Sequence, residues 1–400
     1  MQKSLFRMSL FAFSFCLGAA FLVHAEQQEP FIIGLDADMS AVAAEGGTAI
    51  FRGASLAIEE INQAGGLLGR QISLVVKDHR GNPARGLRNL AQLSEEPNLL
   101  AVIGGVHTPV VLQELDLIHQ KPLIFLVPWA AGTAIIDNGF EPNYVFRVSV
   151  RDSEAASVIL SNIKRRGVKR VALILERTGW GRSNEKSMEQ VAAKLGIDIV
   201  ATEWINWRQQ AFDEAVTRIA DSDAEAVVMV ANAPEGAVAA TSLFNNRKTQ
   251  QLPIVSHWGI AGGKFAELLG LDILTQLDLS VLQTFHFQQA NNPQLAESLL
   301  ARYRSSFDAE ASPKSIKGQV GLAHAYDLIH MLAQAVETAQ SSEPKAVRDA
   351  LQSLQEHQGL IKTYVQPFVE NQDALWASDY ILTTYDVQGD LIPRPRNEAE

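Results

Sequence analysis

The sequence almost lacks cysteine, with Cys16 the single thiol among 400 residues. One thiol excludes a disulfide framework within the chain and any cysteine-rich metal site. Basic residues are also in deficit, because 34 Lys and Arg stand against 45 Asp and Glu, giving a formal charge of −11. This deficit argues against a nucleic-acid binder, whose affinity depends largely on cations that neutralise phosphates.

Common enzyme motifs are missing as well. The sequence has no G-x-S-x-G, no G-x-x-x-x-G-K-[ST], no H-E-x-x-H, and no G-x-G-x-x-G after a predicted strand. The glycines at 65–69 follow a predicted helix and precede a predicted strand, which favours a helix end and turn over a nucleotide loop. The nine histidines show no metal-ligand spacing. We therefore expect no enzyme, no cofactor and no metal site.

The N-terminus differs from the rest of the chain. Lys3 and Arg7 precede an apolar run from Met8 to Val23, and Val23-His24-Ala25 fits a cleavage site. This pattern predicts a secretory signal peptide over 1–25, removed after Ala25, and therefore an exported protein. A retained membrane anchor is the alternative, although the run is short for a bilayer span. Cleavage also removes the only cysteine.

The remaining chain has an ordinary globular composition, 47% hydrophobic and 20% charged, and enough length for two domains. Short β-branched runs alternate with amphipathic stretches, the pattern of βαβ units on a parallel sheet. A turn-rich break at 137–143 divides two such series. We predict an α/β protein with two doubly wound parallel-sheet lobes that face each other, and ligands beyond the carboxyl ends of the strands.

The predicted strands and helices have the following ranges. The strands are 31–35, 71–77, 100–103, 123–127, 170–175, 197–203, 226–230, 254–256 and 379–385. The helices are 48–64, 84–93, 108–119, 153–166, 183–195, 212–220, one from 235, 294–307, 318–338 and 345–354.

Polar residues follow the predicted strand 100–103. Threonine is favoured at a helix N-cap and proline at the first helical position, so a helix is predicted to begin at Thr108, before Pro109. Its unpaired N–H groups would face the cleft between the lobes, where they suit a carboxylate. The alternative is that Thr108 only caps its own helix and His107 bonds to a loop.

Three of the six tryptophans, Trp129, Trp180 and Trp258, also follow predicted strands. Side chains at that edge of a sheet reach the crevice, so an aromatic-lined pocket and ordinary packing remain as two interpretations. Asp36 and Asp38 leave the first strand, where they either face a cation or are solvated loop acids.

Several motifs resemble one known family. They are Phe51-Arg52-Gly53-Ala54, Ala57-Ile58-Glu59-Glu60-Ile61-Asn62, Gly65-Gly66-x-x-Gly69, Val102-Ile103-Gly104-Gly105 and Phe146-Arg147 with Asp152. Together, from about residue 31 to 389, the chain resembles the leucine/isoleucine/valine-type periplasmic substrate-binding proteins of ABC transporters. The resemblance implies the type I periplasmic-binding fold, with two lobes, three crossovers and a ligand trapped by hinge closure.

The crossovers are expected near Val150, Phe285 and Ala377. The resemblance then implies an N-terminal lobe of residues 26–150 and 286–377, and a C-terminal lobe of residues 151–285 and 378–400. It also implies a monomer in the periplasm.

The resemblance assigns roles at the binding site. A Ser or Thr at the start of the third helix holds the ligand's carboxylate, and Thr108 falls there, beside His107. Backbone groups after the fourth strand also contact the ligand, which points to Trp129, Ala130 and Ala131. An aromatic residue from the second lobe covers the ligand, and Trp180 matches it.

Two departures from the family bear on the ligand. Trp258 stands where relatives that bind amino acids carry an acid for the ammonium, and Gly46 stands where many have an aromatic residue. A buried ammonium needs a compensating partner, which Asp36 or Asp38 would have to supply. Otherwise Trp258 faces an apolar or aromatic group, or a quaternary ammonium through cation–π attraction.

We therefore expect a solute-binding protein that captures an amino-acid-like or an aromatic or apolar carboxylate and delivers it to the permease subunits of an ABC importer. The alternative is a periplasmic sensing subunit for a membrane signalling protein, which would use the same clamp.

Overall fold

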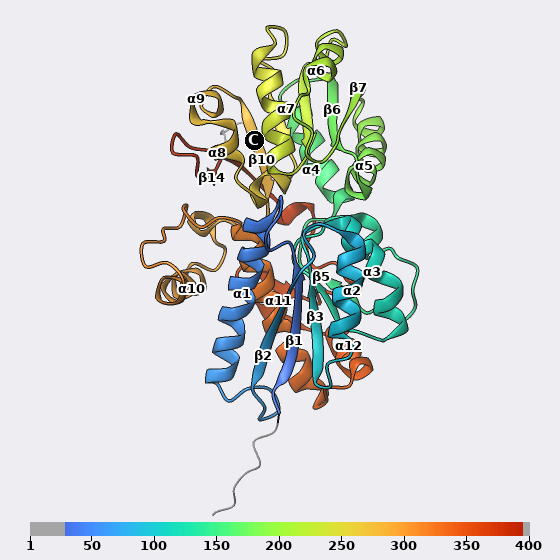
Figure 1. The fold of residues 1–400 in the computed structure, drawn as a ribbon, viewed down its shortest axis with the longest axis vertical. Coiled ribbons are helices and arrows are strands. Elements are labelled where there is room, and N and C mark those ends of the chain that lie inside the picture. The colour runs from blue at the N-terminus through green and yellow to red at the C-terminus, as the bar shows by residue number, and fades with distance from the viewer. Residues whose placement is uncertain (1–28, 395–400) are drawn as a thin grey trace, which may run out of the picture.

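The computed structural model describes residues 29–394, which form two α/β lobes, one above the other in Figure 1. The lower lobe holds a five-stranded parallel sheet in the order β2-β1-β3-β4-β5. The upper lobe holds a seven-stranded sheet in the order β14-β13-β10-β9-β8-β6-β7, in which β13 is antiparallel to both of its neighbours, β10 and β14. The predicted fold class is confirmed.

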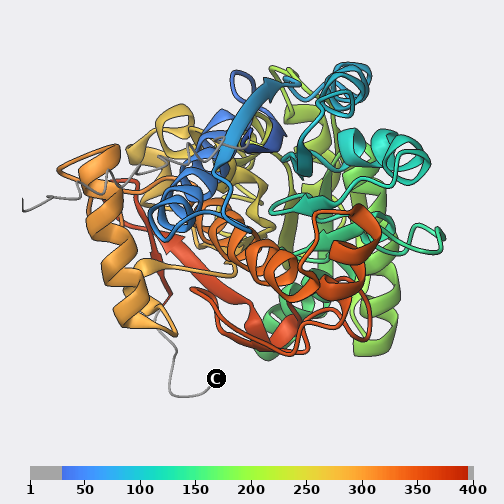
Figure 2. The same cartoon turned by 90° about the horizontal axis from the view of Figure 1, so that it is seen from below.

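The elements of the lower lobe come from both ends of the chain. They are β1 (Phe31–Ala37), α1 (Ala44–Gln63), β2 (Ile72–Asp78), α2 (Pro83–Leu93), β3 (Leu99–Gly104), α3 (Thr108–Gln120), β4 (Phe125–Val127), β5 (Val145–Arg147), α10 (Pro293–Ser306), α11 (Gln319–Ala339) and α12 (Pro344–Gln352). The helices α1 and α11 pack side by side, as the view from below shows (Figure 2). A small hairpin of β11 (Glu356–Gln358) and β12 (Thr363–Val365) follows α12.

The upper lobe takes the middle of the chain and its last strands. Its elements are α4 (Asp152–Arg165), β6 (Arg170–Glu176), α5 (Gly179–Leu195), β7 (Asp198–Ile205), α6 (Asp213–Ala220), β8 (Ala226–Val230), α7 (Ala233–Asn245), β9 (Ile254–Ser256), α8 (Phe265–Leu269), α9 (Leu271–Leu274), β10 (Leu279–Gln283), β13 (Ile381–Tyr385) and β14 (Leu391–Pro393). A 3₁₀ turn, η2 (Trp258–Gly262), follows β9.

Burial explains why the strands read as continuous apolar runs in the sequence. The central strands β3, β4 and β8 are almost entirely buried, as expected for parallel strands covered on both faces by helices. Each predicted strand and helix overlaps an observed element of the same type. The sequence did not predict the strands β5, β10, β11, β12 and β14 or the helices α8 and α9, since segments of three to five residues carry little periodicity.

The chain passes between the two sheets after β5, after β10 and before β13. A buried ion pair lies next to two of these passages. The guanidinium of Arg147 binds the carboxylate of Asp373, with Nη2 to Oδ2 at 2.9 Å, and Arg151 binds the same oxygen at 2.8 Å. Because both Arg147 and Asp373 are buried, their mutual pairing is needed to offset the loss of hydration.

The predicted signal peptide and its cleavage after Ala25 lie outside the described residues. No helix within 29–394 combines the length and apolarity needed to cross a bilayer.

Candidate functional site

A cavity of about 20 Å³ lies where the two lobes meet, at the carboxyl ends of the strands. Six residues predicted from the sequence line it, and they are His107, Thr108, Trp129, Ala131, Trp180 and Trp258. The lower lobe supplies those that follow β3 and β4, and the upper lobe those that follow β6 and β9. The structure therefore brings together residues from four strand ends that are up to 151 positions apart.

Thr108 begins α3 and is fixed to the loop after β4. Its hydroxyl accepts a hydrogen bond from the backbone N–H of Gly132 at 3.1 Å, and no side chain caps the helix. A side chain at position 132 would collide with the Thr108 methyl group, so glycine permits this close approach. His107 occupies the N-cap position, so the interpretation that Thr108 caps its own helix is wrong, whereas its other part, a bond from His107 to a loop, agrees with the contact between His107 and Asp38.

Arg147 forms hydrogen bonds with the backbone of the same loop, the one that follows β4. Its Nη1 donates to the carbonyl oxygens of Ala130 at 3.2 Å and Gly132 at 2.8 Å. Ala130 is buried and does not line the cavity, unlike its neighbour Ala131. The buried guanidinium of Arg147 therefore binds both Asp373, near a crossing segment, and the loop whose Gly132 contacts Thr108.

Asp38 reaches the cavity only through His107. Its Oδ2 lies 2.9 Å from His107 Nε2, and its oxygens accept the backbone N–H groups of Ala41 at 2.7 Å and Ala43 at 3.0 Å. Burial acts to raise the pKa of Asp38, but the bond to His107 and these N–H groups outweigh it and lower the pKa to about 2. Asp38 is therefore a charged positioning group for His107.

Asp36 lies away from the cavity. It accepts a hydrogen bond from Asn89 Nδ2 at 2.8 Å, and it faces the buried Glu114 across Gly86. Burial raises the pKa of Asp36 to about 7, against the opposing effect of Asn89. Neither Asp36 nor Asp38 is placed to pair with a ligand ammonium in this cavity.

The Trp129 ring packs against three glycines, whose missing side chains leave room for it. A Cβ atom would come within 3.3 Å of its indole from Gly46, 3.2 Å from Gly262 and 2.8 Å from Gly321. Gly46 therefore contacts the Trp129 ring and does not line the cavity. The ring occupies the space that a side chain at position 46 would need, and it packs on Trp258 of the other lobe.

Trp180 lies in the first turn of α5, which begins four residues earlier than predicted. Its Nε1 donates to Asp152 Oδ1 at 3.2 Å, and its ring meets His257 edge-on with centroids 5.1 Å apart. The backbone N–H of Asp152 in turn donates to the Ala131 carbonyl at 2.9 Å. The orientation of Trp180 is thus tied to the segment that crosses between the lobes.

Among the lining residues that were not predicted as site residues, two have polar side chains, Glu176 and Asn232. Glu176 ends β6, and its Oε2 accepts from the Asn232 backbone N–H at 3.1 Å and from Asn232 Nδ2 at 2.7 Å, while its other oxygen accepts from Trp207 Nε1. Burial raises the pKa of Glu176 to about 7 in spite of these donors. Glu176 ends β6 and Asn232 follows β8, and both strands are buried. A position at the end of a buried strand is also the signal that identified Trp180.

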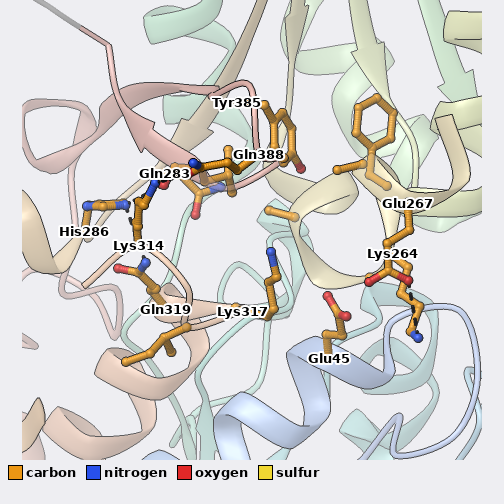
Figure 3. A pocket seen from close by; sticks show the side chains of 18 of the residues that line it. Glu45, Lys264, Glu267, Gln283, His286, Lys314, Lys317, Gln319, Tyr385 and Gln388 are labelled. Carbon is orange, nitrogen blue, oxygen red and sulfur yellow. Dashed lines mark hydrogen bonds and ion pairs between the residues drawn. The ribbon is translucent and has the colours of Figure 1, made fainter. Parts of the chain in front are cut away.

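A second and larger cavity of about 440 Å³ also lies between the lobes (Figure 3). The η2 turn contributes to both cavities, with Gly259 at the small one and Ala261 at the large one. The large cavity is bounded by the start of α1, by α8, by the β13–β14 hairpin and by the loop before α11. None of the nine residues predicted as site residues lines it.

Comparisons with known proteins agree with this architecture. The family model described as periplasmic binding protein matches residues 30–383. Over 343 residues the chain is 24% identical to the Leu/Ile/Val-binding protein homolog 3 of Brucella melitensis biotype 1, which covers 85% of this chain and 86% of that relative.

Two solved structures are similar over nearly their whole length. One is the branched-chain amino acid transporter substrate binding protein LivJ from Streptococcus pneumoniae, in complex with isoleucine (TM-score 0.74, 21% identity, 92% of this chain and 100% of that chain). The other is an ABC transporter solute binding protein from R. palustris in complex with benzoate (TM-score 0.73, 17% identity, 93% and 99%). At these identities the two structures establish the fold.

Proposed function

This chain belongs to the periplasmic binding protein family, and from that premise we propose that it captures a small organic solute between its lobes and delivers it, unaltered, to an ABC importer. The observation that carries the proposal is the meeting of Thr108 from one lobe with Trp180 and Trp258 from the other around a single cavity. A solute held there would contact both lobes at once and so favour their closed arrangement.

The proposed ligand is an amino-acid-like or an aromatic or apolar carboxylate. Thr108, at the start of α3, supports a carboxylate, because a helix N-terminus and a hydroxyl both stabilise negative charge. The three indoles supply apolar walls for the rest of the molecule. Glu176, in the same cavity, is the acid available for an ammonium group, in the role that the sequence suggested for Asp36 or Asp38. The relatives in complex with isoleucine and with benzoate represent these two ligand classes.

The present cavity is too small for either ligand. About 20 Å³ accommodates roughly one water molecule. Entry of a solute therefore requires the lobes to separate, and we propose that the crossing segments at 148–151, 284–286 and 377–380 act as the hinge. The lobes on either side would be residues 26–150 with 286–377, and residues 151–285 with 378–400. We further propose that the mature chain begins after Ala25 and acts in the periplasm as a monomer.

Calorimetric titration tests the proposal. The chain from Glu26 onward would be unfolded and refolded to remove any solute carried from the cell, then titrated with isoleucine, benzoate and glycine betaine. We expect one of the two carboxylate classes to bind with one molecule per chain, and Thr108→Ala to weaken it by about 1–3 kcal/mol, the usual effect of leaving a charged acceptor unpaired. The exposed Thr338→Ala on α11 is the matched control. Failure of isoleucine, benzoate and betaine alike to bind a correctly refolded chain would contradict the proposal.

A further inference from the structure

The larger cavity between the lobes carries an unmatched negative group. The carboxylate of Glu45, in the first turn of α1, has no hydrogen-bond or ion-pair partner among residues 29–394. Burial raises its pKa and outweighs the opposing charges of Lys317 and Lys264. A carboxylate that is partly withdrawn from water and left without a partner is costly unless a cation compensates it.

None of the three lysines that line the cavity lies within ion-pair distance of Glu45, and each pairs with a different acid. Lys314 binds Asp386 at 2.9 Å, Lys317 binds Asp390 at 3.0 Å, and Lys264 lies 3.4 Å from Glu267. The first two pairs join the loop before α11 to the β13–β14 hairpin, and so link the lower lobe to the upper one beside the cavity.

The wall opposite Glu45 is aromatic. Tyr385 at the end of β13 stacks on Phe265 of α8, with ring centroids 5.6 Å apart at 29°. Figure 3 shows the Tyr385 hydroxyl and the Glu45 carboxylate pointing into the cavity from opposite sides. The Tyr385 hydroxyl has no hydrogen-bond partner in the described part of the chain, and the charge of Glu45 adds to burial in raising its pKa. Ile316 and Leu391 add apolar surface.

We propose that this cavity is a second solute site, which takes an apolar molecule carrying an ammonium group, with Glu45 as its counter-charge and the Phe265–Tyr385 pair as its aromatic wall. The volume of about 440 Å³ lies within the range of small-molecule pockets. An ammonium group is attracted both to a carboxylate and to the face of an aromatic ring. Because Glu45 belongs to one lobe and the aromatic pair to the other, the bound amine favours the closed arrangement, whichever solute binds beside Thr108.

Titration with 2-phenylethylamine tests the site, with 3-phenylpropionate as a probe of similar size and opposite charge. We expect the amine to bind and the acid to bind at least tenfold more weakly. Glu45→Gln should weaken the amine at least tenfold, while Glu59→Gln, an exposed acid on the same helix, should leave its affinity within twofold.

The Thr108→Ala variant separates this proposal from the one for the small cavity. Amine affinity retained in that variant supports two separate sites, whereas its loss would show that the amine binds beside Thr108 and would overturn the inference. Absence of amine binding, equal binding of 3-phenylpropionate, or an unchanged affinity in a Glu45→Gln protein whose thermal unfolding is normal would each overturn it as well.

Discussion

The indole rings of Trp129 and Trp258 lie 5.3 Å apart across the boundary between the lobes, at an angle of 37° to each other. Trp129 follows β4 of the lower lobe, and Trp258 opens the η2 turn of the upper lobe. Both rings are buried, and both line the small cavity together with Thr108 and Trp180. This contact is one of those that hold the lobes together, and we expect solute entry to separate the two rings.

Removal of the indole N–H from Trp180 tests whether this residue serves binding or only packing. Trp180→Phe keeps an aromatic ring but deletes the hydrogen bond to Asp152. We expect solute affinity to fall by about 1–2 kcal/mol, because the ring loses its fixed orientation. Titration calorimetry would measure this loss, and urea unfolding would report stability. An affinity equal to that of the parent, with lower stability, would assign Trp180 to packing alone.

The ion pair at the crossing segments should dominate stability. Asp373→Asn leaves the buried Arg147 without its counter-charge, and we expect the free energy of unfolding to fall by about 3–5 kcal/mol. Asp349→Asn, which removes a partner from the exposed Lys345, is the control and should cost less than about 1 kcal/mol. Chemical denaturation measures both variants. Equal losses in the two would mean that the Arg147 pair is unimportant.

The buried Asp36 should give the protein a defined pH dependence. Its folded pKa of about 7 lies above the ordinary value of 3.8, so the folded state binds the proton more tightly than the unfolded chain. The stability associated with the protonated form is full below about pH 4 and is lost as the pH rises toward 7.

Asp36→Asn removes the titrating carboxyl, so the variant does not lose this stability as the pH rises. The difference in unfolding free energy between Asp36→Asn and the parent should therefore grow in favour of the variant by about 1.4 kcal/mol per pH unit between pH 4 and 7. Denaturant unfolding at a series of pH values measures it. The exposed Asp116→Asn on α3 is the control, because its carboxyl loses little solvent on folding. If the difference in unfolding free energy between Asp36→Asn and the parent does not change with pH, the raised pKa of Asp36 is contradicted.

Much of the fold and part of the site could be predicted from the sequence. Parallel strands produce apolar runs, and the residues that follow each run lie at the edge where the crevice forms, which is why Thr108, Trp180 and Trp258 line one cavity. The same rule selected Asp38 but does not reveal side-chain direction, and the carboxylate turns to His107 and the backbone. Glu176 was overlooked because an acid at a strand end is usually solvated, whereas here Asn232 and Trp207 enclose it.

The larger cavity could not be predicted from the sequence. Glu45 and Tyr385 are 340 positions apart, and the β13–β14 hairpin, which closes one side, contains a strand too short to recognise. Only tertiary packing brings the loop around Lys317 against that hairpin. No local pattern at Glu45 indicates that its carboxylate lacks a partner.

The most direct measurement is a crystal structure of the refolded chain from Glu26 onward with the carboxylate that titration identifies as its ligand. We predict electron density for one solute between the lobes, with its carboxylate within hydrogen-bond distance of Thr108 and its apolar part against Trp180, and Trp129 and Trp258 farther apart than 5.3 Å. Density for the solute on one lobe alone, with the tryptophan pair still in contact, would contradict the account.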